Sequence, residues 1–191
     1  MDISEVKMAI PKRFIRSEEA DGIKFFYETL TIQTERENLT QLDTKLLPYV
    51  QPNDYFFVED ITDRLKSIVA VSGVQDGSLL VQVLHTSAML SMNELDEPML
   101  LGDINRRVND IVPKSSNYLH NSPLRSKNLC EDDYKCDRNG DAHVKSCLFG
   151  TPSITIIVRG GELVLGQWQK VCLIDFDGPR TRSVVAQVMG V

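Results

Sequence analysis

The chain has 191 residues, a length that suits one compact domain, and its 42% hydrophobic and 25% charged residues exclude a fully disordered chain. Its formal net charge of -6 argues against a binder of the nucleic-acid backbone, which would be expected to be basic. No apolar run approaches the ~18 residues of a membrane span, and the N-terminus lacks a signal peptide, so we expect a cytoplasmic protein without a membrane partner.

The first third of the chain predicts two strands and a helix. Residues 1–23 are mixed and charged, and we interpret them as an extension that is partly disordered. Residues 25–32 and 55–58 are rich in aromatic and β-branched residues, which is typical of strands. Residues 62–72 have the apolar stripe of a helix, with Thr62 as the expected N-terminal cap and Gly73 as the end.

The rest of the chain predicts more strands than helices. Residues 78–84 form a buried strand that runs into His85, and residues 94–112 form a helix that Pro113 stops. Residues 114–142 are polar and are expected to be a long functional or mobile loop. Four further strand segments follow: 153–158, 163–165, 167–176 and 183–188. Because strands and helices do not alternate regularly, we expect an α+β fold.

The chain has only three histidines, His85, His120 and His143, and they come from separate segments. Three imidazoles can hold Zn²⁺ and leave its fourth position open for water or substrate, as catalytic zinc sites do. The alternative is three unrelated, hydrogen-bonded histidines, because no local pair of H-x-x-x-H type is present. The histidines therefore bound the imidazole chemistry that this chain can perform.

Two carboxylates of the second predicted helix are candidate catalytic groups. Glu94 lies at its start, where the helix dipole alone would favour an acid. Asp103 lies at the margin of the buried stripe, where it could orient a histidine or act as a base; a solvated helix-face acid is the alternative.

Other residues carry weaker signals. Arg180 follows a turn and could hold a phosphate, or simply be solvated there. Trp168, the only tryptophan, is interpreted as a core residue. Cys130 and Cys136 could join a histidine pair in a Cys₂His₂ zinc site, an alternative to the three-histidine site. Their spacing, however, is wider than that of a zinc knuckle. Four cysteines in a chain of this length do not imply a disulfide framework.

Five blocks of residues together resemble one family, the YjbQ family of long-uncharacterised proteins, over about residues 24–191. The blocks, in chain order, are His85-Thr86-Ser87-Ala88, Asn93-Glu94, Asp141-Ala142-His143-Val144-Lys145-Ser146, Leu165-Gly166-Gln167-Trp168-Gln169 and Asp177-Gly178-Pro179-Arg180-Thr181-Arg182. The resemblance implies a compact single-domain α+β fold with a β-sandwich and two or three helices, and a homotrimer. It leaves residues 1–23, and an enlarged loop over residues 127–138, outside the pattern.

The resemblance also implies a thiamine-phosphate synthase-like transferase, which joins a pyrimidine diphosphate to a thiazole phosphate. Its pocket would combine metal ligands, catalytic acids and groups that bind a phosphorylated small molecule. The metal ligands expected are His85, His120 and His143, with zinc as the favoured divalent metal. The catalytic residues expected are Glu94 and Asp103, and the substrate-binding residues expected are Thr86, Ser87, Asn93, Lys145, Trp168, Gln169 and Arg180. A zinc-dependent hydrolase and a non-catalytic trimeric binding protein are the alternatives for the same pocket.

Overall fold

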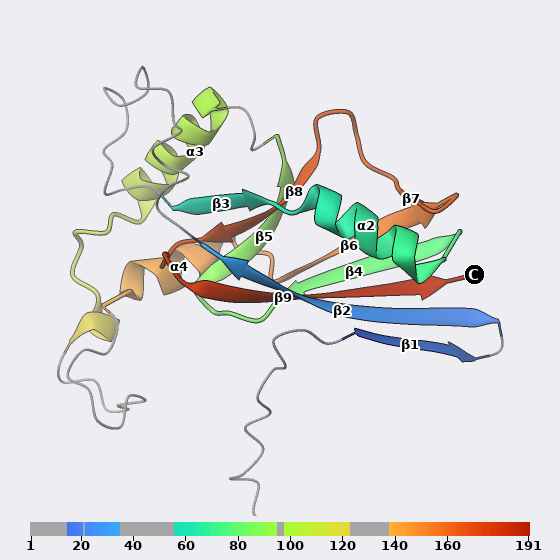
Figure 1. Ribbon diagram of the computed structural model, residues 1–191. Coiled ribbons are helices and arrows are strands. Elements are labelled where there is room, and N and C mark those ends of the chain that lie inside the picture. The colour runs from blue at the N-terminus through green and yellow to red at the C-terminus, as the bar shows by residue number, and fades with distance from the viewer. Residues whose placement is uncertain (1–14, 21, 35–55, 95–97, 123–137) are drawn as a thin grey trace, which may run out of the picture.

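The computed structural model describes residues 15–20, 22–34, 56–94, 98–122 and 138–191 (Figure 1). These residues form two antiparallel sheets and three α-helices. No described helix combines the length and the apolar character that a membrane crossing requires.

The larger sheet has six strands, and the central ones pair segments that lie far apart in the sequence. In spatial order the strands are β1 (Ile15–Ala20), β2 (Ile23–Gln33), β9 (Thr181–Gly190), β4 (Gly77–Val83), β6 (Ser153–Arg159) and β7 (Glu162–Leu163). The C-terminal strand β9 therefore lies between β2 and β4, and all of these pairs are antiparallel. Gly160 and Gly161 both have positive φ and make the tight turn between β6 and β7.

The smaller sheet has β8 (Lys170–Asp175) at its centre, between β3 (Phe57–Asp60) and β5 (Ala88–Asn93). Ala88 at the start of β5 is paired with Asp175 at the end of β8. This pairing brings the segment after His85 beside the turn that joins β8 to β9.

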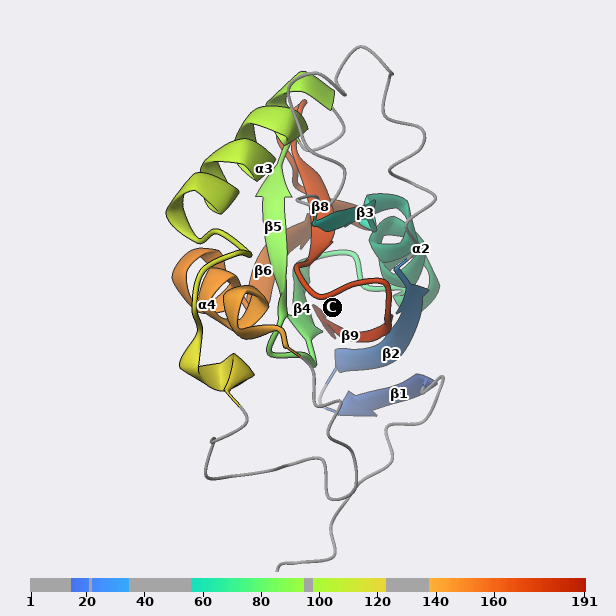
Figure 2. The same ribbon diagram turned by 90° about the vertical axis from the view of Figure 1, so that its left-hand side faces the viewer.

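Helix α2 (Thr62–Ser72) lies apart from the other two helices, α3 (Pro98–Ile111) and α4 (Gly140–Phe149), which lie near each other (Figures 1 and 2). Helix α2 packs against strands of the larger sheet. Helices α3 and α4 lie on the same side as β5, and a single 3₁₀ turn, η1 (Leu119–Asn121), contacts α4.

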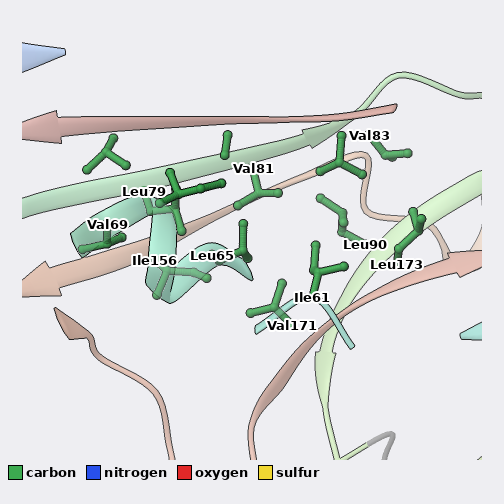
Figure 3. Packing of buried hydrophobic residues seen from close by; sticks show 14 of the residues in the cluster. Ile61, Leu65, Val69, Leu79, Val81, Val83, Leu90, Ile156, Val171 and Leu173 are labelled. Carbon is green, nitrogen blue, oxygen red and sulfur yellow. The ribbon is translucent and has the colours of Figure 1, made fainter. Parts of the chain in front are cut away.

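The main hydrophobic core lies where α2 meets the two sheets. Its buried members include Leu65 and Val69 of α2, Leu79 of β4 and Leu173 of β8, and Figure 3 shows these side chains converging from separate elements. A second cluster joins β5 and β8 to α3 through Met89, Ile174 and Val108. Strand β9 buries alternate residues, the period-2 pattern expected of a half-buried strand. Strand β8 is buried on both faces, because its successive residues belong in turn to the first and the second cluster.

The α+β single-domain fold expected from the sequence is confirmed, and so is the helix over residues 62–72. Gly73 ends that helix in the left-handed conformation, with φ of 68°. The assignment of Thr62 as the cap is wrong. Asp60 Oδ1 accepts the Thr62 backbone N–H, and the Thr62 hydroxyl oxygen accepts the backbone N–H of Val171.

Three other predicted boundaries are wrong. Residues 15–20, placed in the extension, form β1 and pair with β2, although the domain boundary itself stays a prediction. The helix predicted over residues 94–112 is described from Pro98 to Ile111, and Glu94, its predicted first residue, lies outside any helix directly after β5. The polar segment 114–142, predicted as a loop, contains η1 and the start of α4. Its residues 123–137, which include Cys130 and Cys136, lie outside the described residues.

Candidate functional site

An open cleft of about 540 Å³ lies between the end of β4 and helix α4. It brings two of the three histidines together: His85, which follows β4, and His143 of α4. The lining residues are Gln82, Val83, Leu84, His85, Thr86, Ala88, His143, Ser146, Cys147, Gly150 and Pro152. Among these described residues the ionisable groups are two imidazoles and one thiol, and none is a carboxylate.

Nitrogen donors lie on both sides of the His85 ring. The backbone N–H of Ser183 donates to Nε2 at 2.9 Å, and Nη1 of Arg182 lies 3.4 Å from Nδ1. Because a neutral imidazole offers one acceptor nitrogen, we assign the lone pair to Nε2, which has the shorter contact, and the proton to Nδ1.

The surroundings of His85 also oppose its positive charge. Burial lowers the pKa of His85, and the nearby Arg182 guanidinium lowers it further; the Asp175 carboxylate acts in the opposite direction. A protonated ring would also lose its acceptor for the Ser183 N–H. His85 is therefore best suited to accept that hydrogen bond as a neutral ring.

We predict that His85 makes the folded state sensitive to acid. Its pKa is lower in the folded chain than its ordinary value of 6.5, so the unfolded state binds more protons. This contribution to stability is fully present above pH 6.5 and is lost as the pH falls from there toward the folded-state value. In urea unfolding at several pH values, the wild-type free energy should decline more steeply than that of His85→Gln. Parallel declines would contradict this assignment.

His143 and His120 form the second part of the site. Their rings meet edge to face with centroids 4.8 Å apart, His143 on α4 and His120 on the exposed turn η1. Among the described residues, the His143 side chain makes this ring contact and no hydrogen bond or ion pair. The His143 ring therefore remains able to exchange protons with a molecule in the cleft.

A buried ion pair lies behind His85. Arg182 donates through Nε to Asp175 Oδ2 at 2.8 Å and through Nη2 to Oδ1 at 2.6 Å, and both side chains are at most 5% exposed. Nη2 of Arg182 also donates to the hydroxyl of Ser87 at 3.2 Å. Thr34 Oγ1 lies 2.9 Å from Asp175 Oδ2. This network fixes the β8–β9 turn against the segment that carries His85.

The two cations that we expected to bind substrate have protein partners. Lys145 is buried, and its Nζ lies 3.0 Å from Asp141 Oδ2 and donates to Asn109 Oδ1 at 2.8 Å. Arg180 is paired with Asp177, with Nε 3.0 Å from Oδ2. Neither cation is among the residues that line the cleft.

The predicted catalytic carboxylates also lie away from the cleft lining. Glu94 follows β5 instead of opening a helix, and its backbone N–H donates to Asn93 Oδ1 at 2.8 Å. Asp103 is 72% exposed and lies 3.7 Å from Arg106, so it is the solvated helix-face acid that we considered as the alternative.

The remaining predicted substrate-binding residues are dispersed. Thr86 lines the cleft, whereas Ser87 is buried against Arg182. Trp168 is 63% exposed in the β7–β8 connection, so its interpretation as a core residue is wrong. Gln169 is next to it, and its Oε1 accepts the backbone N–H of Gly166.

Cys147 also lines the cleft, although no motif in the sequence pointed to it. It is an exposed free thiol that lines the cleft four residues after His143 on α4. Residues at this spacing share one face of a helix, so the His-x-x-x-Cys pattern would have placed the two together once α4 was recognised. The helix escaped recognition because its buried positions include Asp141 and Lys145, which blurs the apolar stripe.

The described residues do not form the expected metal site as they lie. They contain no group of three or more His, Cys, Asp or Glu side chains arranged to hold an ion. The lone pair of His85 Nε2 already accepts the Ser183 N–H, and Nδ1 faces a guanidinium. Binding of a cation through this histidine would require those contacts to break.

Comparison with protein families and curated proteins gives a consistent set of matches. The family model described as "UPF0047 protein YjbQ-like" matches residues 49–191. A UPF0047 protein of Methanocaldococcus jannaschii is 34% identical over 131 residues, which cover 69% of this chain and 83% of that protein. The UPF0047 protein YugU of Bacillus subtilis is 33% identical over 131 residues, covering 69% and 88%.

Solved structures share the same fold. A YbjQ-like protein of unknown function from Sulfolobus solfataricus superposes with a TM-score of 0.67 at 28% identity, covering 88% of this chain and 99% of that one. A protein of the yjbq/upf0047 family from Clostridium acetobutylicum has a TM-score of 0.62 at 31% identity, covering 84% and 98%.

These findings overturn the expected thiamine-phosphate synthase-like function with its three-histidine metal pocket, which is wrong. The matched relatives are UPF0047 proteins, described without an activity or as of unknown function, and nothing in them points to that reaction. The described residues hold no metal-binding group, and Lys145 and Arg180, the two cations expected to bind the substrate, are paired with carboxylates.

Proposed function

The chain belongs to the YjbQ-like UPF0047 family, and from the geometry of its cleft we propose that it is an acid–base enzyme acting on a small phosphorylated molecule. In this proposal His143 is the residue that moves protons, and His85 helps to shape the cleft as a neutral ring. The reaction proposed here uses side chains of this protein alone.

The observation that carries the proposal is the position of His143. Its half-buried ring lines a cleft large enough for a small metabolite and touches a second imidazole, His120. An imidazole changes its protonation near neutral pH, which suits a general acid or base. The adjacent ring of His120 can take part in relaying that proton to solvent, because it is exposed on η1.

The chemistry of the lining supports an anionic ligand. Its described residues include no carboxylate to repel a phosphate, and the imidazole of His143 can donate a charge-assisted hydrogen bond when protonated. Thr86 contributes a hydroxyl from the strand side of the cleft. The Ser146 hydroxyl donates to the backbone oxygen of Ala88 at 3.3 Å, which leaves its oxygen to accept a proton from a ligand.

Three further expectations accompany this proposal. A homotrimer is supported by the 63% exposure of Trp168, a large apolar side chain that a second copy could cover, and sedimentation equilibrium measures it directly. The cytoplasmic location stays a prediction. So does a divalent metal cofactor, and no step of the proposed reaction depends on one.

We predict that His143→Gln weakens phosphate-ester binding about 10–100-fold, because a charge-assisted hydrogen bond is worth about 1.5–3 kcal/mol. Methyl phosphate titrated into the full chain should shift the ring proton signals of His143 in NMR spectra. Any conversion found in a panel of small phosphorylated metabolites should fall about 10²–10⁴-fold in His143→Gln.

The control for this experiment is Lys66→Met, on the exposed face of α2, which should bind methyl phosphate as the wild type does. Equal binding by wild type and His143→Gln, or shifts confined to residues outside the cleft, would contradict the proposal. Turnover that survives in His143→Gln would remove this residue from proton transfer.

A further inference from the structure

Cys147 lines the cleft, whereas Cys172, the other cysteine among the described residues, does not. It lies on the cleft face of α4 one helical turn after His143, and both side chains line the same opening. Its thiol is free and exposed. A molecule that enters the cleft therefore meets a sulfur nucleophile and an imidazole together.

Helix geometry places the two side chains within reach of each other. Residues four apart on an α-helix have Cβ atoms about 5–6 Å apart. Helical side chains also tend to lean toward the N-terminus, and this favours an approach between a residue and the one four positions before it. The imidazole can then accept the thiol proton, and the resulting thiolate is the reactive form of cysteine.

Cys147 differs from the other described thiol in its exposure and in the side chains around it. The described residues lining the cleft include no carboxylate that would repel negative sulfur. Cys172, by contrast, is 1% exposed and packs among apolar side chains of the second cluster, including Met89 and Ile174. A buried structural cysteine of this kind is inert.

We propose that Cys147 is a thiol–disulfide exchange site for low-molecular-weight disulfides of the glutathione class, with His143 as its base. The thiol proton passes to His143, and the thiolate attacks one sulfur of the disulfide. The S–S bond of the small disulfide breaks as the new S–S bond to Cys147 forms. The departing thiolate takes the proton from His143 and leaves as a thiol, so the disulfide is the oxidant and Cys147 is oxidised.

The test uses the reduced full-length chain with glutathione disulfide near neutral pH. Peptide mass spectrometry should place an adduct on Cys147 and follow its rate separately from those of the other cysteines. His143→Gln should slow this adduct about tenfold or more, because the base is removed. As a check that does not depend on the variant folding, the wild-type rate should follow the titration of an imidazole, read from the His143 ring signals over pH.

A matched control is Ser67→Cys in a Cys147→Ser background. It creates a cysteine on the exposed face of α2 with Asp63, an acid, four residues before it. Cys147 should react about tenfold faster than this control cysteine. Equal rates at the two positions, or an unchanged rate in folded His143→Gln, would overturn the proposal. Exchange requires no phosphorylated ligand, so a failed phosphate test would leave this result standing, and the reverse also holds.

Discussion

Replacing Asp175 by alanine is expected to lower the free energy of unfolding by about 3–5 kcal/mol, because it leaves the charge of Arg182 buried without its partner. Asp175 is fully buried and accepts two hydrogen bonds from the guanidinium, at 2.6 and 2.8 Å. It also accepts the backbone N–H of Asp177 at 3.0 Å, so the same change releases the β8–β9 turn. Urea unfolding measures the loss as a lower midpoint.

A double variant distinguishes the effect of losing the ion pair from the effect of losing side-chain volume. Asp175→Leu combined with Arg182→Met removes both charges and keeps apolar volume, so it should recover much of the stability that Asp175→Ala loses. The single variant should also disturb the environment of His85, because Arg182 would no longer be held 3.4 Å from its ring. A loss below about 1 kcal/mol in Asp175→Ala would show that the pair is solvated and would contradict the burial argument.

Lys145→Met is expected to lower the free energy of unfolding by a similar amount, about 3–5 kcal/mol, because it leaves the buried carboxylate of Asp141 without its cation. The two side chains are each 5% exposed, and Nζ of Lys145 also donates to Asn109 of α3 at 2.8 Å. The variant should therefore loosen α4 from α3 as well as lower the midpoint of urea unfolding. Hydrogen exchange of the α4 amides would report this loosening as faster exchange.

The chain offers a control with the same chemistry on its surface. Lys66 and Asp63 form an ion pair at 2.9 Å on the exposed face of α2. Lys66→Met should leave the unfolding midpoint unchanged within error, because solvent screens an exposed pair. Equal effects of Lys66→Met and Lys145→Met would contradict the claim that burial makes the second pair important.

Much of the fold could be predicted from local pattern. The stripe of Leu65 and Val69 with Gly73 after it marks helix α2, and Gly160-Gly161 marks the β6–β7 turn, because these signals need no distant partner. Helix α4 could not be predicted, because its buried face carries the Asp141–Lys145 pair. Lys145 can face the interior because Asn109 of α3, a residue distant in the sequence, accepts a further hydrogen bond from it.

The candidate site also has features that the sequence determines and features that only the tertiary structure decides. By itself the sequence determined the family, through its blocks of residues, and a limit of three histidines on the imidazole chemistry. Only the tertiary structure decided which of those groups are available to a ligand. It holds His85 between Ser183 and Arg182, leaves the His143 ring in the cleft and sets Cys147 beside it. The physical reason is that burial and partners, which come from segments distant in the chain, fix whether a polar group is engaged or reactive.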